Sequence, residues 1–562
     1  MKMKTIRPST SFFIIAGCLL AVKLWLVSAQ YLQATYTPQD DLLFIRQANS
    51  ILSGHWLGPY NQMTLIKGPF YPLFIALAYW LAIPLMTAQQ LLWWGACIVF
   101  VLAIYPAIRS QKLALLLFLF LLMNPFTYYY DATGRVFRLG IYSSLGFLSL
   151  SCLCGLIIRD RQSWKRKLCW AAAGGLFFAA FWHTREESIW LVPSLLLVFL
   201  FHLLRTYRGG GGKKAVGSLL AIYLVPLLIF SSVTLALCLQ NYRHYGLFMT
   251  IEVESAPFKS AYGGLLRIKS DQWRRFFPVV ADARRKAYAV SPSFAELKPY
   301  LEGNLARGWE NMAGTKDLPA AFFIWAFRDA VAAAGHYRNS ADTMAYYESI
   351  GRQIDAACED GRLDCRPRFT DLIPPWHQEF NKLLLPTWWS IFKRIVSFDE
   401  CSADTAGRFS WGPGKIMMMY ETVTREKLRT SKPSVWRSSP EYNRHLNKEK
   451  IRILDDIGKF YSRIVPPLFI AAFIALLCSL GTSLYKRFLP SWACIFGLSA
   501  LGGVTALSVI LTLVAITSYS EITRAMQAAY PMVMFFIIAS LYDAWRLWRR
   551  RGSRPDDPER WE

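Results

Sequence analysis

Residues Trp492 to Thr517 read WACIFGLSALGGVTALSVILTLVAIT and contain no charged side chain. A run of about 20 apolar residues is long enough to cross the hydrocarbon core of a bilayer as a helix. Other long runs are Thr10–Gln30, Gln89–Ile108, Leu139–Ile158 and Ala215–Leu239, and shorter ones are Leu113–Tyr128, Leu168–Trp182, Ile189–Leu204, Tyr461–Leu480 and Tyr530–Leu547. We therefore predict an all-α, polytopic membrane protein with about ten spanning helices.

The basic residues gather in the short connections between the apolar runs. The chain carries a formal net charge of +25, and 54% of its residues are hydrophobic. Short loops rich in Lys and Arg stay on the cytoplasmic side and attract anionic lipid headgroups, so the charge indicates topology and membrane lipids rather than nucleic acid. The clusters are Arg159, Arg161, Lys165, Arg166 and Lys167; Arg205, Arg208, Lys213 and Lys214; Lys486 and Arg487; and Arg546, Arg549, Arg550 and Arg551.

The apolar stretch Phe70–Met86 is interrupted by Pro72 and Pro84. If it crossed the membrane, the basic cluster Arg159–Lys167 would lie outside, against the charge rule. We therefore predict a re-entrant or interfacial helix here, which is tolerated at membrane depth where protein covers its ends. Both termini are then cytoplasmic, and the long segment from about Gln240 to Phe460 lies on the opposite side.

This topology divides the chain into four parts. We predict an N-terminal membrane module over 1–240 with a catalytic first exported loop at 31–69, and a large, mainly helical exported loop domain over 241–459. C-terminal membrane helices over 460–548 and a cytoplasmic tail over 549–562 complete the chain. In the exported domain, Cys358 and Cys365 flank a turn-forming sequence, and we hypothesise a disulfide between them because exported compartments are oxidising.

The first exported loop contains the pair Asp40 and Asp41. In a helix that starts at Pro38, both carboxylates lie at the head of the apolar stripe, where a catalytic acid beside a membrane belongs. Thr37 with Asp40 also matches a capping box with proline at the first helical position. Capping explains Asp40 but leaves Asp41 unexplained.

Further ionisable residues lie at predicted membrane boundaries on the same side. Such groups are costly at this depth, so they are usually paired or functional. They are Asp131, Arg135 and Arg138 in one loop, Arg185, Glu186 and Glu187 in the next, and Glu521 with Arg524 before the last span.

These features together resemble the GT-C class of membrane glycosyltransferases, which includes protein O-mannosyltransferases and lipid A aminoarabinose transferases. The acidic pair is followed by an amphipathic helix ending in Ser53-Gly54-His55-Trp56, and Lys67-Gly68-Pro69 leads into a short apolar helix. The class also has a second acidic residue, an Arg-x-Glu and a late Arg before a proline; the matching residues here are Asp131, Arg185, Glu187, Arg524 and Pro531. The resemblance covers residues 1 to about 200, and the long central loop departs from it.

The resemblance implies transfer of a sugar from a polyprenyl-phosphate donor to a lipid, glycan or protein acceptor at the outer face of the membrane. The sequence has no Asn-x-Ser/Thr sequon, which fits a bacterial origin and hence an inner-membrane location. Asp40 is the expected base, with a pKa raised by burial. Asp41 or Asp131 would orient the acceptor or hold a divalent cation such as Mg²⁺ or Mn²⁺. The groups expected to neutralise the leaving phosphate are Lys67, Arg135, Arg138, Arg185 and Arg524.

Three other classes remain open. An assembly or scaffold protein that acts through the long loop makes no prediction about the small loops. A lipid-linked glycan flippase or transporter also needs a basic cavity, but it would be expected to show repeats between its halves, and we find none. A ligase of the O-antigen type would place its key residues in the long loop. The candidates for that reading are His336, Arg338, Trp376 and His377.

Overall fold

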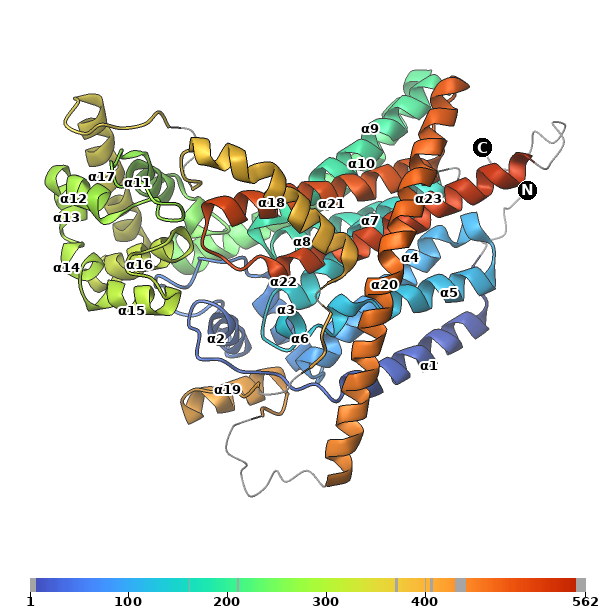
Figure 1. The fold of residues 1–562 in the computed structure, drawn as a ribbon, viewed down its shortest axis with the longest axis horizontal. Coiled ribbons are helices and arrows are strands. Elements are labelled where there is room, and N and C mark those ends of the chain that lie inside the picture. Colours follow the sequence, from blue (N-terminus) through green and yellow to red (C-terminus); the bar gives the residue numbers. More distant parts are fainter. Residues whose placement is uncertain are drawn as a thin grey trace.

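The computed structural model describes residues 7–160, 162–209, 212–368, 372–399, 401–404, 408–429 and 441–551. Over these residues the regular structure is helical, and β-pairing is limited to isolated bridges. Figure 1 shows a bundle of long helices with a smaller group of helices at one end. The all-α, polytopic class is thus confirmed. Arg161 of the first basic cluster and residues 552–562 of the expected tail lie outside the described residues.

Within the described part of the chain, eight helical segments are long and apolar enough to cross a membrane. Their helices are α1 (Thr10–Val27), α4 (Leu85–Ile108), α7 (Leu139–Ile158), α9 (Val192–Arg208, preceded by the 3₁₀ turn η2, Glu186–Leu191), α10 (Gly212–Tyr245), α20 (Glu441–Tyr485), α21 (Trp492–Thr517) and α23 (Tyr530–Arg551, preceded by α22, Thr523–Met526, and η4, Gln527–Ala529). The chain is therefore a multi-pass membrane protein.

The two remaining expected spans differ from these eight. The helix α5 (Gln111–Leu122) has 12 residues and a length of about 18 Å, short of a core of about 30 Å. It ends before Asn124-Pro125, whose asparagine side chain caps a new turn, η1 (Pro125–Thr127). The helix α8 (Trp164–Trp182) has 19 residues, and basic side chains occupy its first turn.

The stretch expected to be re-entrant or interfacial forms two elements. The helix α3 (Phe70–Trp80) has 11 residues, about 16 Å, which is too short to cross the core. A turn with Ala82 at a φ of 58° follows, and α4 then starts at Leu85. The length of α3 fits a helix that does not cross.

The bundle is organised around α7, in which most side chains are buried. It packs against α4 and α8, while α8 also packs against α10, and α23 lies between α20 and α21. Small residues allow close approach: Gly155 of α7 lies against the Trp170 ring, and Gly175 of α8 lies against the backbone of Pro226 in α10.

The expected loop domain 241–459 forms two regions in the structure. The first, which we call the loop domain, has its own apolar core and lies at one end of the molecule in Figure 1. It contains η3 (Glu252–Glu254), α11 (Ala256–Arg267), α12 (Ala281–Val290), α13 (Pro292–Ala295), α14 (Lys298–Leu301), α15 (Asn304–Ala313), α16 (Ala320–Ala333) and α17 (Ser340–Glu359).

The second region returns to the bundle. The helix α18 (Gln378–Ser397) packs along α21, where Trp388 Nε1 donates to Ser508 Oγ at 2.9 Å. The helix α19 (Gly414–Thr424) packs against α3 and α2 (Asp41–Leu52). The helix α20 starts at Glu441 and continues through the expected boundary at residue 460. Its first half is polar and its second half is apolar, and both belong to one continuous helix.

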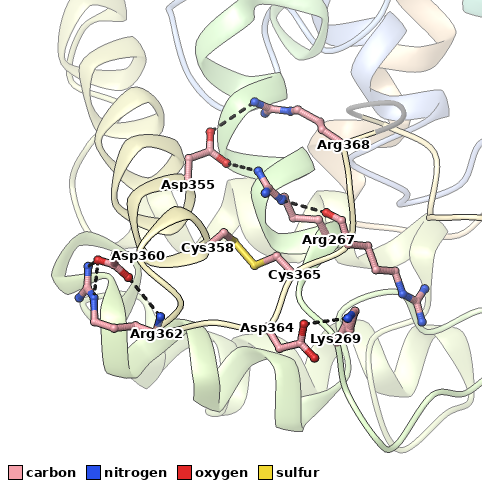
Figure 2. Close-up of a disulfide and its surroundings, with 10 residues drawn as sticks. Arg267, Lys269, Asp355, Cys358, Asp360, Arg362, Asp364, Cys365 and Arg368 are labelled. Carbon is pink, nitrogen blue, oxygen red and sulfur yellow. Dashed lines mark hydrogen bonds and ion pairs between the residues drawn. A yellow bond between two sulfur atoms is a disulfide. The ribbon is translucent and has the colours of Figure 1, made fainter.

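The hypothesised disulfide is present: Cys358 and Cys365 are bonded at the end of α17 (Figure 2). The chain after the bridge runs back beside the end of α11, where Ile268 pairs with Cys365. Lys269 also forms an ion pair with Asp364 at 2.7 Å. The bridge thus closes the turn that ties α17 to α11.

Candidate active site

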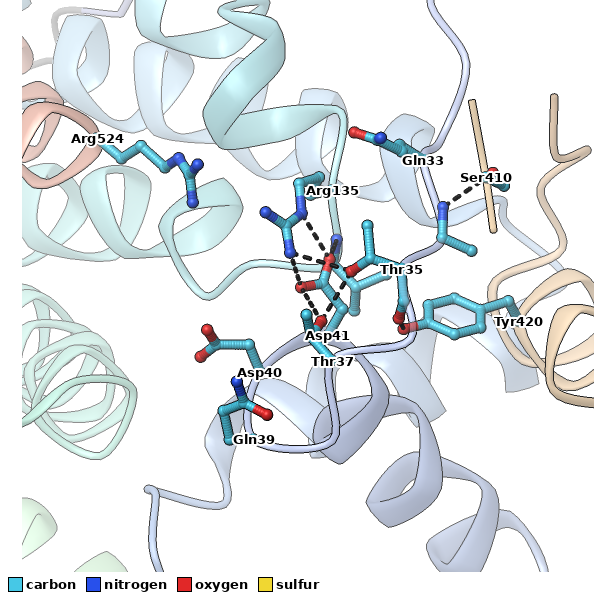
Figure 3. A network of polar contacts seen from close by, with 12 residues as sticks. Gln33, Thr35, Thr37, Gln39, Asp40, Asp41, Arg135, Ser410, Tyr420 and Arg524 are labelled. Carbon is cyan, nitrogen blue, oxygen red and sulfur yellow. Dashed lines mark hydrogen bonds and ion pairs between the residues drawn. The ribbon is translucent and has the colours of Figure 1, made fainter. Parts of the chain in front are cut away.

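The segment 31–69 lies between the bundle and the loop domain and holds the acidic pair. The helix α2 begins at Asp41 rather than at Pro38, because a tight turn precedes it. In this turn the Thr37 carbonyl accepts hydrogen bonds from the amides of Asp40 at 3.1 Å and Leu42 at 3.3 Å. Asp40 is the N-cap residue, yet its side chain makes no capping bond. The capping-box interpretation of Asp40 is therefore wrong. The turn directs the two neighbouring carboxylates to different surroundings (Figure 3).

The Asp41 carboxylate is fully buried and saturated with donors. Arg135 donates hydrogen bonds to it through Nε at 3.1 Å and Nη2 at 2.5 Å. The Val136 amide and the Thr37 hydroxyl each donate to it at 3.2 Å. Burial raises the pKa of Asp41, and the Arg135 guanidinium opposes that shift. Asp41 thus joins segment 31–69 to the next loop and has no free oxygen with which to act on a substrate.

The Asp40 carboxylate remains accessible, with 43% of the side chain exposed. It forms an ion pair with Lys67, whose ammonium group also donates to the Gln39 carbonyl at 2.7 Å. Burial alone would raise the pKa of Asp40, but Lys67, with help from Arg138 and Arg135, brings it below the ordinary value. The expected raised pKa is therefore wrong, because the ammonium partner outweighs desolvation. Asp40 is ionised at neutral pH.

Lys67 reaches the site because the next residue, Gly68, has no side chain. A Cβ on Gly68 would collide with the carbonyl oxygen of His183. This close backbone contact brings the Lys67-Gly68-Pro69 segment against the loop before α9, which contains the predicted Arg185 and Glu187.

That loop also supplies Glu186, which lies at a predicted membrane boundary but has no role in the site expected from the sequence. Arg138 donates to the Thr184 carbonyl at 2.9 Å and to Glu186 at 2.7 Å. Glu186 also acts electrostatically on Lys67, so it belongs to the same cluster. The predicted Arg185 and Glu187 form an ion pair with one another, next to the Tyr142 ring.

Arg524 approaches from the start of the last span. Its guanidinium group lies 4.9 Å from the centroid of the Phe137 ring, and Arg135 lies 4.2 Å from the same ring. It forms an ion pair with Glu521 at 3.0 Å, but its buried Nε has no hydrogen-bond partner. Figure 3 shows this guanidinium group directed toward Arg135 and the Asp40 side of the turn. A buried donor without an acceptor is suited to an anionic ligand.

Asp131 takes part in a different set of contacts. It accepts from Arg408 at 2.8 Å and lies near the Tyr129 hydroxyl. Arg408 belongs to the segment that returns from the loop domain, so the residues around Asp131 in the sequence do not predict this pair. Each of the three predicted catalytic carboxylates is thus matched with a basic side chain.

This pairing also bears on the divalent cation. Among the described residues, no group of three or more His, Cys, Asp or Glu side chains is placed to hold a metal ion. The oxygens of Asp41 already accept from Arg135, Val136 and Thr37, and Asp40 is engaged by Lys67. This donor set does not fit Mg²⁺ or Mn²⁺, and we assign no step to a metal.

The residues of the ligase alternative lie in separate places. His336 stacks on Tyr346 and pairs with Glu296 at 3.1 Å. His377 instead stacks on Trp273 at 3.7 Å between ring centroids. The two histidines therefore have different neighbours and no shared site.

No protein-family model and no curated protein sequence matches the chain. Among solved structures, it is similar to ArnT from Cupriavidus metallidurans in the apo state, with 13% identity and a TM-score of 0.32 over 95% of this chain and 77% of that one. It is also similar to ArnT bound to undecaprenyl phosphate, with 14% identity and a TM-score of 0.30 over 97% of this chain and 79% of that one.

A third similar structure is the archaeal oligosaccharyltransferase AglB from Archaeoglobus fulgidus, in complex with an inhibitory peptide and a dolichol-phosphate. Identity is 9%, the TM-score is 0.38, and the match covers 99% of this chain and 53% of that one. The chain thus spans about half the length of AglB.

Proposed function

We propose that this protein is a membrane glycosyltransferase that moves a sugar from a polyprenyl-phosphate donor to an acceptor hydroxyl. The supporting observation is the Asp40 carboxylate, which is accessible, ionised and surrounded by fixed cations. An accessible carboxylate is able to accept a proton from an acceptor hydroxyl. Fixed cations stabilise the negative charge that grows on a leaving phosphate.

In the proposed reaction, the acceptor oxygen attacks the anomeric carbon on the face opposite the phosphate. A new carbon–oxygen bond forms while the bond from the anomeric carbon to the phosphate oxygen breaks, so the configuration inverts. The hydroxyl proton passes to Asp40, and the electron pair of the broken bond leaves with the polyprenyl phosphate. Arg524, whose Nε has no hydrogen-bond partner, and Lys67 are the groups that would neutralise the negative charge on the leaving phosphate.

The lowered pKa of Asp40 has a mechanistic consequence. It keeps the carboxylate ionised across the neutral range, but it also makes Asp40 a weak base. Proton transfer must then come late, after the acceptor oxygen has begun to bond to the anomeric carbon and its proton has become more acidic.

The two neighbouring aspartates provide the test. In Asp40→Asn we expect turnover to fall roughly 10²- to 10⁴-fold, as on loss of a general base, with a smaller loss of stability than in Asp41→Asn, because the Asp40 side chain is partly exposed. Asp41→Asn removes the buried carboxylate charge that is paired with Arg135, so we expect it to lower the unfolding temperature. The assay follows release of polyprenyl phosphate from a polyprenyl-phosphate sugar by purified full-length protein. Wild-type turnover in Asp40→Asn would overturn the proposal.

We also propose a bacterial inner-membrane location with both termini in the cytoplasm and the loop domain outside. In Figure 1, α1 begins and α23 ends at the end of the bundle away from the loop domain, which supports this orientation. Reporters fused after Lys214 should report cytoplasm, and reporters fused at residue 350 should report the outside. A cytoplasmic signal from residue 350 would refute the orientation.

A further inference from the structure

The loop domain places a tryptophan beside the proposed base. The ring of Trp325, on α16, lies 5.4 Å from Lys67 Nζ, and that ammonium group is the partner of Asp40. Trp325 is only partly buried, unlike its neighbours on the helix, Phe323 and Phe327, which are in the core. An aromatic ring that packs against the core but keeps part of its surface exposed therefore adjoins the reacting groups.

The Trp325 ring is held in a fixed position. The Trp309 ring lies nearly parallel to it, at 16° with 6.3 Å between centroids, and Trp309 Nε1 donates to Asp329 at 2.9 Å. On the same helix, the fully buried Arg328 pairs with Glu252 at 2.6 Å and donates through Nε to the Gln62 carbonyl at 3.0 Å. Since Gln62 belongs to the segment that carries Lys67, the ring is fixed relative to Asp40.

Gln39 adds a polar group with a poor partner. Its side-chain amide donates to the Met312 thioether sulfur at 3.2 Å, and sulfur is a weak acceptor. Only 9% of the Gln39 surface is exposed, so water does not fully supply the missing acceptor for this amide. In Figure 3 its side chain lies next to that of Asp40, on the other side from the Arg135 and Arg524 guanidinium groups. A hydroxyl group would be a better acceptor for this amide.

We propose that Trp325 and Gln39 form a subsite for a sugar ring of the acceptor, so that the loop domain selects a carbohydrate hydroxyl. The apolar C–H face of a sugar ring packs on an aromatic face, and its hydroxyls accept from an amide. Arg524 lies on the other side of Asp40 from Gln39 and suits the donor phosphate, so the Trp325 and Gln39 side chains are left for the acceptor. The inference rests on the proposed function and specifies its acceptor class.

The first experiment measures binding without turnover. Saturation-transfer-difference NMR is recorded on the purified full-length protein in lipid nanodiscs with methyl glycosides of mannose, glucose, galactose and N-acetylglucosamine. We expect ring protons of at least one glycoside to receive saturation, and Trp325→Ala to weaken its binding about tenfold, while Trp325→Phe retains it. The matched control is Trp389→Ala, an exposed tryptophan on α18, which should bind as wild type.

Absence of saturation transfer to every glycoside in the wild type would overturn the subsite, as would wild-type binding in Trp325→Ala. Asp40→Asn should still bind the glycoside, because Asp40 acts in the reaction and not in stacking. Loss of turnover without loss of binding thus separates this proposal from the proposed function, and each one fails on its own measurement.

A second experiment distinguishes an acceptor sugar from the donor sugar. Release of polyprenyl phosphate is measured while the bound methyl glycoside, and then the donor, is varied. For Trp325→Ala we expect KM for the glycoside to rise about tenfold with little change in kcat and in the KM for the donor. A rise confined to the donor KM would assign the ring to the donor sugar and overturn the acceptor subsite.

Discussion

Two ion pairs, one within segment 31–69 and one where the loop domain contacts that segment, share the same chemistry but have different surroundings. Glu252 and Arg328 of the loop domain are both fully buried, and Tyr60 and Tyr337 donate to the same carboxylate at 2.8 and 2.6 Å. The Asp40 side chain, by contrast, keeps 43% of its surface exposed although Lys67 is nearly covered.

The difference indicates what each pair does. A sealed, fully hydrogen-bonded pair has no way to exchange a partner with a substrate, so its role is to join the loop domain to segment 31–69. A pair with an open carboxylate is able to release its partner for a reacting group. Accessibility, rather than charge, therefore separates the structural pair from the catalytic one, and each prediction below tests that distinction.

The largest expected effect on stability is at the sealed pair. Arg328→Met leaves Glu252 buried without its counter-charge, so we expect the protein to lose about 3–5 kcal/mol of stability. Thermal or denaturant unfolding of the purified protein measures this loss. The double variant Arg328→Met with Glu252→Gln should recover part of it, because no unpaired charge remains. An unchanged unfolding transition in Arg328→Met would remove the contrast between the two pairs.

At the open pair, Lys67→Met should affect activity and its pH dependence. Loss of a fixed cation beside the leaving phosphate should lower turnover roughly 10²-fold. Without Lys67, the burial of Asp40 is less opposed, so the Asp40 pKa rises from its present position below the ordinary value. The base must be ionised, so activity should disappear at a higher pH than in the wild type as the solution is acidified.

The same shift has a stability counterpart with a defined sign. The lowered Asp40 pKa contributes stability above the pKa of the unfolded chain, and that contribution is lost as pH falls through the lower folded value. Lys67→Met should therefore be less acid-sensitive in stability than the wild type. The matched control is Lys269→Met, whose exposed pair with Asp364 should matter little for turnover or its pH profile. Identical pH–rate profiles for wild type and Lys67→Met would contradict the assignment of Asp40 as base.

The smallest effect is expected at the disulfide, which lies in the loop domain on the sealed side of the comparison. Replacing Cys358 and Cys365 by serine should lower stability by about 2 kcal/mol, because the loop that the bridge closes is short. Turnover should be retained, since the Arg328 and Glu252 pair still fixes α16. Unfolding curves measure the change, with Cys169→Ser, an exposed free cysteine, as control. Two free thiols in unreduced peptides from native membranes would exclude the bridge.

The sequence predicted features that depend on neighbouring residues. The apolar runs located the spanning helices because a helix in lipid satisfies its own backbone groups. The short loop around Cys358 and Cys365 likewise suggested its disulfide. The helix α18 was missed, because only one of its faces is apolar and Pro386 interrupts the pattern.

Features that depend on distant partners were not predictable in this way. The sign of the Asp40 pKa shift depends on Lys67, which is far along the chain and reaches the carboxylate only through the fold. The partner of Asp131 is Arg408, and the ring beside Lys67 comes from Trp325 in another domain. Sequence reasoning named most of the charged residues of the site, but only the fold assigned their partners.

The backbone contact at Gly68 gives this site an unusual kind of vulnerability. The position contributes no functional group, yet one added methyl would push segment 31–69 away from His183 and pull Lys67 from its place. A mutational scan would therefore score position 68 as strictly as a catalytic residue. Such a scan would detect a requirement for the absence of a side chain at this position, because segment 31–69 and the loop of His183 are in direct backbone contact there.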